Sequence, residues 1–591
     1  MALDTRTVQR IGTTGHTLQN EEDGRELAGS HILCEALIRE GVKIMYGYPG
    51  GAIMPFYDAF AAYPQLHHVL VRHEQAAAHA ADGYARATGN VGVCVATSGP
   101  GATNLVTGLA TSFMDSTPIV AITGQVAQPL IGRDGFQETD VLGVTQPITK
   151  HNYLVRSADE IADVVHEAFY VARSGRPGPV LIDVPKNVQF ARAFYRPGVY
   201  KRNYEAQWRA AMQPPASHLI ARATQLIAEA RRPLIMAGHG VILSNAYEEL
   251  MKLAEKTSIP VIATLLGLSA FPEDHPLYIG LPGMHGPAHV NHAIGEADLI
   301  IGVGLRFDDR VTGKVSEFAP HAQFIHIDID ASEMNKVKVA AVPIVADAKV
   351  ALAALGEAVA PANHQDWLGE IRSWQAADEQ RVQNVRHDTG LPEPTAILQA
   401  IRSVTNGDAI VVSDVGQHQM WTARFYQWTR PNSHITSGGL GTMGFGLPAA
   451  MGVKMGLPDA TVWVVAGDGG IQMNIQELAT LQQEGIELKV AIMNNGYLGM
   501  VRQWQQFFHG GNYAETPITG PDYVKLAEAY GVTGMRVTRR DEVEAAVQRA
   551  MQTPGTVIID FVIESEANVY PMVAPGAAIT NMIEEQAEGN S

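Results

Sequence analysis

Short runs of Val and Ile recur along the chain from about residue 28, and each is followed by a segment whose apolar positions have helical spacing. Many of these runs end in paired glycines or a Gly-x-Gly turn, which is typical of parallel β-α-β units. The segments with strand character are 92–97, 118–123, 233–237, 298–303, 323–328, 409–413, 461–466, 488–493 and 556–562. The pattern predicts an α/β protein with doubly wound parallel sheets, and not a β-sandwich or a helical bundle.

Three blocks of this pattern predict three domains. Irregular sequence at 195–215 separates the first block from the second, and a polar connector with tryptophan follows the second. We therefore expect domains at residues 27–192, 214–362 and 393–565. A chain of 591 residues agrees with this count, since domains average about 150 residues. The first and third blocks resemble each other more than either resembles the middle one.

The two ends of the chain lie outside these blocks. Residues 1–26 are polar, include Glu21, Glu22 and Asp23, and lack the apolar core of a secretory signal, so we expect a flexible leader. Residues 566–591 are expected to form a C-terminal tail, either a lid over a site or a loose end. No window of about 20 residues is free of Gly, Pro and charge, so no membrane span is expected.

Composition narrows the partners and the compartment. The chain has 43 Lys and Arg against 61 Asp and Glu, a formal net charge of -18, which opposes binding to nucleic acid. The two cysteines, Cys34 and Cys94, have neither CxxC nor Cys/His spacing, so no disulfide framework or zinc site is expected. A cytoplasmic location fits this cysteine usage best.

One β-α-β unit carries the strongest candidate chemistry. An apolar run leads into a Gly-Asp-Gly-Gly turn that contains Asp468, and 27 residues later a second run leads into Asn495. Because neighbouring parallel strands end at one edge of a sheet, these oxygen donors are expected to share a Mg²⁺ ion. Gly469 and Gly470 let backbone amides approach an anion. The motif resembles the thiamine-diphosphate signature, although two such turns can also simply cap two strands.

A second candidate is the carboxylate that thiamine chemistry requires. A carboxyl group against the aminopyrimidine ring protonates a ring nitrogen and makes the exocyclic amine a base. Glu74 is the candidate, because it lies between a strand and an alanine-rich helix, and a poorly solvated carboxyl suits proton exchange with a weak base. The alternative is that Glu74 is an ordinary acidic residue in the first turn of a helix.

Motifs spread over the chain resemble the catalytic large subunit of acetohydroxyacid synthase (acetolactate synthase), a thiamine-diphosphate-dependent family. The resemblance runs from about residue 28 to residue 582. The segments that carry it are YPGGA at 48–52, RHE at 72–74, TSGPG at 97–101, GFQET at 135–139, SGRPGP at 174–179, RFDDRVTGK at 306–314, GTMGFGLP at 441–448 and GMVRQWQ at 499–505.

The resemblance implies that the first domain binds the pyrimidine ring and the third binds the diphosphate of thiamine diphosphate. Asp468, Asn495 and the carbonyl group of Tyr497 would then hold Mg²⁺, and Met443 would be the apolar wedge that bends the cofactor. By itself, a methionine in a glycine-rich turn is usually packing. The implied thiamine-diphosphate contacts are Pro49, Gly50, Gln417, His418, Gly441, Met443, Gly469 and Gly470.

For the middle domain the resemblance implies FAD, with no redox part in the main reaction. The residues alone give a weak signal, because Leu243 and Phe307 stand where a GxGxxG motif has its third glycine. The implied FAD contacts are Arg176, Gly238, Gly240, Thr264, Leu265, Gly283, His285, Gly304, Arg306, Asp328 and Asp347.

The resemblance also implies the reaction. Pyruvate would lose CO₂, and its two-carbon unit would join a second pyruvate to give 2-acetolactate, or 2-oxobutyrate to give 2-aceto-2-hydroxybutyrate. This is the first common step of branched-chain amino acid biosynthesis. The implied partners are a second copy of the chain, as a homodimer or a dimer of dimers that shares its active sites, and a small regulatory subunit.

The substrate residues come from the same resemblance. Phe136, Gln137 and Lys186 would line the approach to the reacting carbon, with Gln137 and Lys186 as catalytic groups beside Glu74. Arg310 and Trp504 would recognise the acceptor, through its carboxylate and its extra methyl group. Taken alone, an arginine after two aspartates is more often part of a surface ion pair, and a single tryptophan is more often core.

The sequence also distinguishes rival functions. Glyoxylate carboligase shares the domains and FAD but has an aliphatic residue in place of Glu74, and the 306–314 and 499–505 segments disfavour pyruvate oxidase and pyruvate decarboxylase. A non-catalytic regulatory paralogue would not be expected to retain Glu74, Asp468 and Asn495. One departure from the family is Ala127, where many members have proline, so access to the site and sensitivity to inhibitors stay open.

Overall fold

The structure is a computed structural model, and it describes residues 24–202, 204, 206–207, 212–383 and 389–584. It contains three six-stranded sheets, in the order β3-β2-β4-β5-β7-β6, β11-β10-β9-β12-β13-β14 and β16-β15-β17-β18-β20-β19. Every strand pair in these sheets is parallel. The α/β class with three doubly wound parallel sheets is therefore confirmed.

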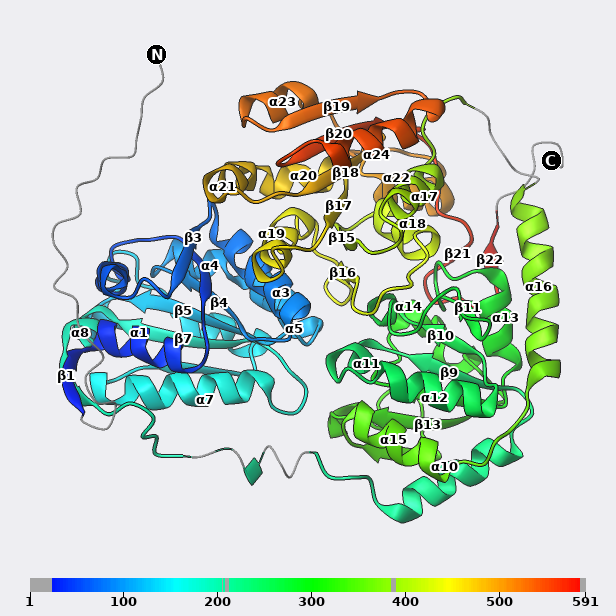
Figure 1. Ribbon diagram of the computed structural model, residues 1–591, viewed down its shortest axis with the longest axis horizontal. Coiled ribbons are helices and arrows are strands. Elements are labelled where there is room, and N and C mark those ends of the chain that lie inside the picture. Colours follow the sequence, from blue (N-terminus) through cyan, green and yellow to red (C-terminus); the bar gives the residue numbers. More distant parts are fainter. Residues whose placement is uncertain (1–23, 203, 205, 208–211, 384–388, 585–591) are drawn as a thin grey trace.

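The first domain (blue and cyan in Figure 1) has its sheet between two layers of helices. Its strands are β2 (Ile44–Gly47), β3 (His67–Leu70), β4 (Gly92–Ala96), β5 (Ile119–Gln125), β6 (His151–Leu154) and β7 (Val180–Pro185). Its helices are α1 (Gly29–Arg39), α2 (Met54–Ala59), α3 (Glu74–Thr88), α4 (Pro100–Asn104), α5 (Val106–Met114), α6 (Val141–Thr145), α7 (Ile161–Arg173) and α8 (Lys186–Phe190).

The middle domain (green in Figure 1) has a different strand order, the one that is common in dinucleotide-binding folds. Its strands are β9 (Pro233–Ala237), β10 (Val261–Ala263), β11 (Tyr278–Gly280), β12 (Leu299–Val303), β13 (Gln323–Asp328) and β14 (Val342–Val345). Its helices are α10 (Ser217–Glu229), α11 (His239–Leu243), α12 (Tyr247–Thr257), α13 (Ala288–Glu296), α14 (Asp309–Thr312), α15 (Ala348–Ala358) and α16 (Gln365–Gln383).

The third domain (yellow to red in Figure 1) repeats the strand order of the first. Its strands are β15 (Ile410–Ser413), β16 (His434–Thr436), β17 (Val462–Gly467), β18 (Lys489–Asn494), β19 (Thr533–Val537) and β20 (Val557–Val562). Its helices are α17 (Pro394–Val404), α18 (Gln417–Phe425), α19 (Gly446–Gly456), α20 (Asp468–Ile471), α21 (Leu478–Glu484), α22 (Gly499–Phe508), α23 (Tyr523–Ala529) and α24 (Val543–Gln552).

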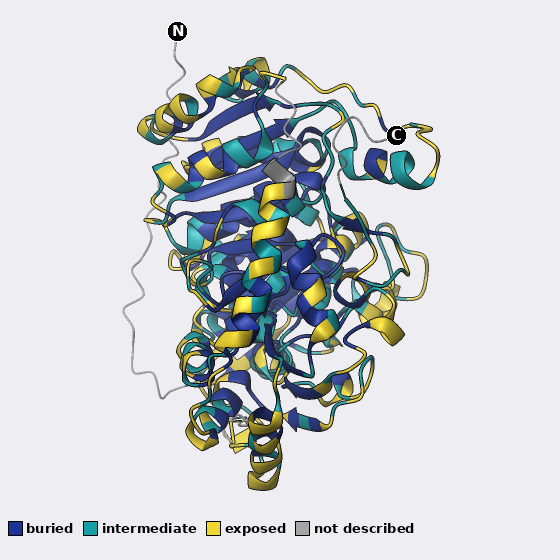
Figure 2. Ribbon diagram, turned by 90° about the vertical axis from the view of Figure 1, so that its right-hand side faces the viewer, coloured by how far each residue is buried: buried dark blue, intermediate teal, exposed yellow. Residues whose placement is uncertain are grey.

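Small residues let the first and third domains pack closely where α3 crosses α19. A methyl group on Gly83 would lie 2.0 Å from the carbonyl oxygen of Ala449, and one on Gly452 would lie 1.9 Å from that of Ala80. The central strands are buried on both faces, and exposed positions lie mainly on the outer sides of the helices (Figure 2). Such burial explains why strands could be predicted from continuous apolar runs.

The structure changes several expected boundaries. The strand β1 (Arg25–Ala28) begins within the expected leader and pairs antiparallel with β8 (Arg192–Tyr195), so the first unit is longer at both ends. Residues 1–23 lie outside the described residues. The polar connector after the second block is mostly the helix α16, whose Trp367 is buried and donates a hydrogen bond to the Pro233 carbonyl group, so the middle unit continues past residue 362.

The C-terminal tail is packed as far as it is described. The strands β21 (Met572–Val573) and β22 (Met582–Ile583) pair with each other, and the Val573 amide donates to the carbonyl group of Met284. The carbonyl group of Ala567 accepts from the side chain of Gln417. A loose end is therefore wrong for residues 566–584, while residues 585–591 lie outside the described residues.

The helix expected after the Gly-Asp-Gly-Gly turn is broken. It consists of α20, a 3-10 segment (Gln472–Glu477) and α21, with Asn474 in a non-helical conformation at the kink. The buried amide of Asn474 donates to the carbonyl group of Gly444, 2.8 Å away, which explains the break. Within the described residues no helix is both long and apolar enough to cross a membrane.

Candidate active site

The predicted metal ligands converge at the carboxyl ends of β17 and β18. These strands are neighbours, with Gly467 opposite Met493. The carboxylate of Asp468 accepts a hydrogen bond from the Gly496 amide at 3.0 Å, and the side-chain oxygen of Asn495 accepts from the Tyr497 amide at 3.1 Å. The chain thus brings together a carboxylate, an amide oxygen and a backbone carbonyl group, a donor set suited to Mg²⁺.

The surroundings of the predicted metal ligands also suit a cation and a diphosphate. Burial raises the pKa of Asp468 from 3.8 to about 6, so a nearby cation would favour its ionised form. Asp468 lines a small cavity together with Gly469, Gly470 and His418. Burial lowers the pKa of His418 to about 3, so its imidazole is neutral, and its Nε2 has no hydrogen-bond partner among the described residues. An unpartnered buried nitrogen is what an absent ligand would leave.

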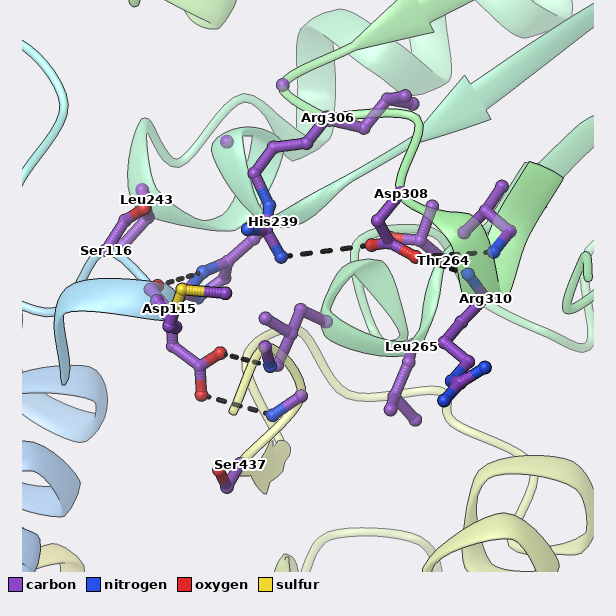
Figure 3. A pocket seen from close by; sticks show the side chains of 18 of the residues that line it. Asp115, Ser116, His239, Leu243, Thr264, Leu265, Arg306, Asp308, Arg310 and Ser437 are labelled. Carbon is purple, nitrogen blue, oxygen red and sulfur yellow. Dashed lines mark hydrogen bonds and ion pairs between the residues drawn. The ribbon is translucent and has the colours of Figure 1, made fainter. Parts of the chain in front are cut away.

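A second, larger cavity of about 950 Å³ is lined by residues of all three domains. The expected FAD residues that line it are Arg176, Gly240, Thr264, Leu265, His285, Gly304, Arg306, Asp328 and Asp347. Figure 3 shows Thr264, Leu265, Arg306 and His239 around this space. Its size and its lining by the carboxyl ends of β9, β12 and β13 fit a dinucleotide.

Two expected FAD residues are not among those that line this cavity. A methyl group on Gly238 would lie 2.2 Å from the carbonyl oxygen of Gly304, and one on Gly283 would lie 2.2 Å from that of Arg310. These glycines therefore allow neighbouring segments to approach closely. Inside the cavity, burial lowers the pKa of His285 to about 4, and its Nδ1 is unpartnered among the described residues, as expected of a side chain that would meet a ligand.

The two expected acceptor-recognition residues meet on the wall of the larger cavity. The guanidinium carbon of Arg310 lies 5.9 Å from the centre of the Trp504 ring. Arg310 also pairs with the Asp309 carboxylate at 3.3 Å, and its side chain is still 58% exposed. The position of Arg310 is therefore compatible with both hypotheses, a surface ion pair and recognition of the acceptor carboxylate.

The two cavities share a wall. Val415, Gly416, Met443 and Met500 line both of them, and Gly441 lines the larger one. A cofactor in the smaller cavity would thus lie next to the part of the larger cavity that is lined by Arg310 and Trp504. The sequence did not point to Val415, although it lies two residues after the end of β15 and directly before Gly416, nor to Met284, Met500 and Leu266.

The remaining expected residues lie on the first domain. The carboxylate of Glu74 is buried, accepts from the Asn104 amide at 2.9 Å, and lies beside Gly101, where a methyl group would be 3.2 Å from it. A methyl group on Gly50, which follows Pro49, would lie 2.5 Å from the side chain of Thr97. Among the described residues, neither Glu74 nor Gly50 lines the two cavities.

Gln137, Phe136 and Lys186 also stand apart from the cavities within the part of the chain that is described. Gln137 has a positive φ of 60°, which is uncommon for a residue with a side chain and marks a tightly held turn. Phe136 is 89% exposed, and Lys186 begins α8. The expected catalytic residues of the first domain therefore do not line the cavities that contain Asp468 and Arg310.

Comparison with known proteins agrees with this architecture. Three models of thiamine pyrophosphate enzymes match: the N-terminal TPP binding domain at residues 27–144, the central domain at 220–355 and the C-terminal TPP binding domain at 414–561.

Full-length relatives are similar over nearly the whole chain. The acetolactate synthase isozyme 2 large subunit of Escherichia coli is 46% identical, covering 94% of this chain and 99% of its own. The acetolactate synthase large subunit of Corynebacterium glutamicum is 44% identical, with 93% and 89% covered. The probable acetolactate synthase large subunit of Methanocaldococcus jannaschii is 46% identical, with 94% and 95% covered. The chain therefore belongs to the acetolactate synthase large-subunit family of thiamine pyrophosphate enzymes.

Proposed function

We propose that this protein condenses two 2-oxo acids: one pyruvate loses CO₂, and its two-carbon unit is joined to a second pyruvate or to 2-oxobutyrate. The observation that carries the proposal is the shared wall of the two cavities. The small cavity that contains Asp468 shares lining residues with the larger cavity, which is lined by Arg310 and Trp504, and this arrangement supports the proposal. A guanidinium group suits the carboxylate of an acceptor, and an indole ring suits its alkyl group.

The residues that would hold the cofactors are those already described. Asp468, Asn495 and the Tyr497 carbonyl group would hold Mg²⁺, and His418 would lie against the diphosphate. When bound, thiamine diphosphate supplies the carbon nucleophile and the electron sink for decarboxylation. The larger cavity would hold FAD as a structural group. Glu74 would exchange a proton with the pyrimidine ring, and Lys186 and Gln137 would bind and orient the substrate.

Because Glu74 does not line the cavity that contains Asp468, we propose that two copies associate and complete each other's sites. The exposed Phe136 fits a surface that is covered on association. A small regulatory subunit, as the name "large subunit" of the relatives suggests, is a further proposed partner. A cytoplasmic location is part of the same proposal, and the free, buried Cys34 and Cys94 agree with it.

The test of the reaction is a competition. The protein, loaded with thiamine diphosphate, Mg²⁺ and FAD, is given equal concentrations of pyruvate and 2-oxobutyrate, and the products are separated. We expect 2-acetolactate and 2-aceto-2-hydroxybutyrate. Acetaldehyde or acetate as the main product would refute the proposal, and so would a parallel assay in which glyoxylate is consumed but pyruvate is not.

The shared site has its own test. Glu74→Gln and Asp468→Asn chains are each expected to be almost inactive, but a heterodimer of the two contains one intact site. An equal mixture that exchanges subunits should therefore recover about a quarter of the wild-type activity. No recovery, with exchange shown by native mass spectrometry, would mean that each site is built from one chain.

A further inference from the structure

Asp115, which directly follows α5, lies where all three domains meet. Its carboxylate is buried and accepts from the Arg86 guanidinium at 2.8 Å in its own domain, and from the amides of Gly438 and Gly439 in the third domain at 3.1 and 2.6 Å. Its backbone carbonyl group accepts from His239 of the middle domain at 2.9 Å. Figure 3 shows Asp115 and His239 at the edge of the larger cavity.

At this junction two buried carboxylates face one guanidinium group, and the glycine amides stabilise the excess negative charge. Arg86 is paired with two buried carboxylates, Asp82 at 2.6 Å and Asp115 at 2.8 Å. The hydroxyl of Ser112 donates to Asp82, and the amides of the third domain donate to Asp115. A buried carboxylate requires such compensation, so these amides are needed for charge balance as well as for packing.

Gly438 and Gly439 are glycines because the junction is tight. A methyl group on Gly438 would lie 2.5 Å from the Leu266 side chain of the middle domain. A methyl group on Gly439 would lie 2.8 Å from the carboxylate of Asp115 and 2.8 Å from the side chain of Met114. The segment is therefore held between the first and the middle domain.

This segment continues into the shared wall of the two cavities. Gly438, Gly439, Leu440 and Gly441 line the larger cavity, and Met443 lines both. The hydroxyl of Thr442 is 2.7 Å from that of Thr111 in the first domain. At the far end, the amide of Gly444 donates to the buried Asp414. The loop is thus fixed by one carboxylate at each end.

We propose that Asp115 is a positioning residue that fixes the wall between the two cavities, so that binding of a flavin dinucleotide in one and of thiamine diphosphate in the other both depend on it. This inference rests on the proposed function for the identity of the two ligands. Without the Asp115 carboxylate, the amides of Gly438 and Gly439 lose at least one of their two charged acceptor oxygens, and Leu440 and Met443 lose their fixed positions.

The test compares Asp115→Asn with a matched control, Asp82→Asn. Both substitutions remove one carboxylate from the same buried Arg86 cluster, but among the contacts of the described residues only Asp115 bonds to the loop. The readouts are thermal unfolding, the Kd of FAD for the apoprotein from quenching of flavin fluorescence, and the thiamine diphosphate concentration that gives half-maximal activity.

We expect both variants to unfold at lower temperature, whereas only Asp115→Asn weakens FAD binding, by roughly tenfold, the effect of losing a charge-assisted hydrogen bond. Its half-saturating thiamine diphosphate concentration should rise similarly. Equal effects of the two variants on the Kd of FAD, or an unchanged Kd in Asp115→Asn, would overturn the inference.

A second variant covers a failure of Asp115→Asn to fold. Gly439→Ala leaves the charge cluster intact but places a methyl group against Asp115, and it should weaken FAD binding in the same way. Unchanged FAD binding in this variant would overturn the inference. If the wild-type protein forms 2-acetolactate and both variants bind FAD normally, only the inference about Asp115 is refuted. If the wild-type protein binds no FAD, both this inference and the proposed cofactor are refuted.

Discussion

The affinity for Mg²⁺ is expected to decrease as the pH is lowered, because Asp468 must be ionised to bind the metal. Burial raises its pKa from 3.8 to about 6. At pH 7 about nine tenths of these carboxyls are ionised and at pH 5 about one tenth, so the affinity should fall roughly tenfold between the two. Asp468→Asn removes both the ligand charge and this source of pH dependence.

The same shift has a consequence for stability. Since the pKa is higher in the folded state than in the unfolded state, the group's contribution to stability is fully present below pH 4 and is lost as the pH rises through about 6. A shift of this size corresponds to about 3 kcal/mol. Mg²⁺, which binds the ionised form, should therefore raise the Tm more at pH 8 than at pH 5.

Calorimetric titration of Mg²⁺ into the protein with thiamine diphosphate, from pH 5 to pH 8, measures the first effect. The diphosphate also titrates, and the Asp468→Asn protein reports that background, because it retains every other group. The difference between the two slopes is the contribution of Asp468. Equal slopes for wild type and variant, or equal affinities, would refute the reasoning.

Three further changes test other parts of the account. Glu74→Gln keeps its shape but cannot exchange a proton, so kcat should fall about 10²- to 10⁴-fold with an unchanged circular dichroism spectrum, and a fully active variant would contradict the role. Trp504→Leu should reduce the preference for 2-oxobutyrate over pyruvate about tenfold in the competition assay, and an unchanged product ratio would exclude Trp504 from acceptor recognition. Gly452→Ala places a methyl group 1.9 Å from the Ala80 carbonyl oxygen. Thermal unfolding should show a loss of about 1–3 kcal/mol or more, whereas Gly356→Ala, where nothing lies within 4 Å, should be neutral or stabilising, and equal effects would contradict the tight crossing.

The sequence was sufficient to predict many of the strands whose side chains are buried on both faces, but it missed the equally buried β7 and β10. β9 and β13 begin and end where the apolar runs do, and β4, β17 and β18 differ by one or two residues. The edge strand β6 was not predicted, because it is partly exposed and carries polar residues, as in His151–Leu154. Only the tertiary contact with Gly444 explains the kink at Asn474.

Some features of the candidate site could likewise be predicted from the sequence, and others could not. The proximity of Asp468 and Asn495 follows from strand order alone, since both residues come directly after neighbouring parallel strands. The meeting of Arg310 and Trp504 was implied only by family resemblance, because they come from different domains. The shared wall and the Asp115 junction depend on how three domains pack, which no local pattern encodes.

The most direct test of the central claim is the stoichiometry of the reaction with pyruvate alone, without oxygen. Carbon-13-labelled pyruvate is followed by NMR while CO₂ is measured and the absorbance of the flavin is recorded. The account predicts two pyruvates consumed for each CO₂ released, 2-acetolactate as the product and an unchanged flavin spectrum. One pyruvate per CO₂, with acetaldehyde as the product or with reduction of the flavin, would contradict it.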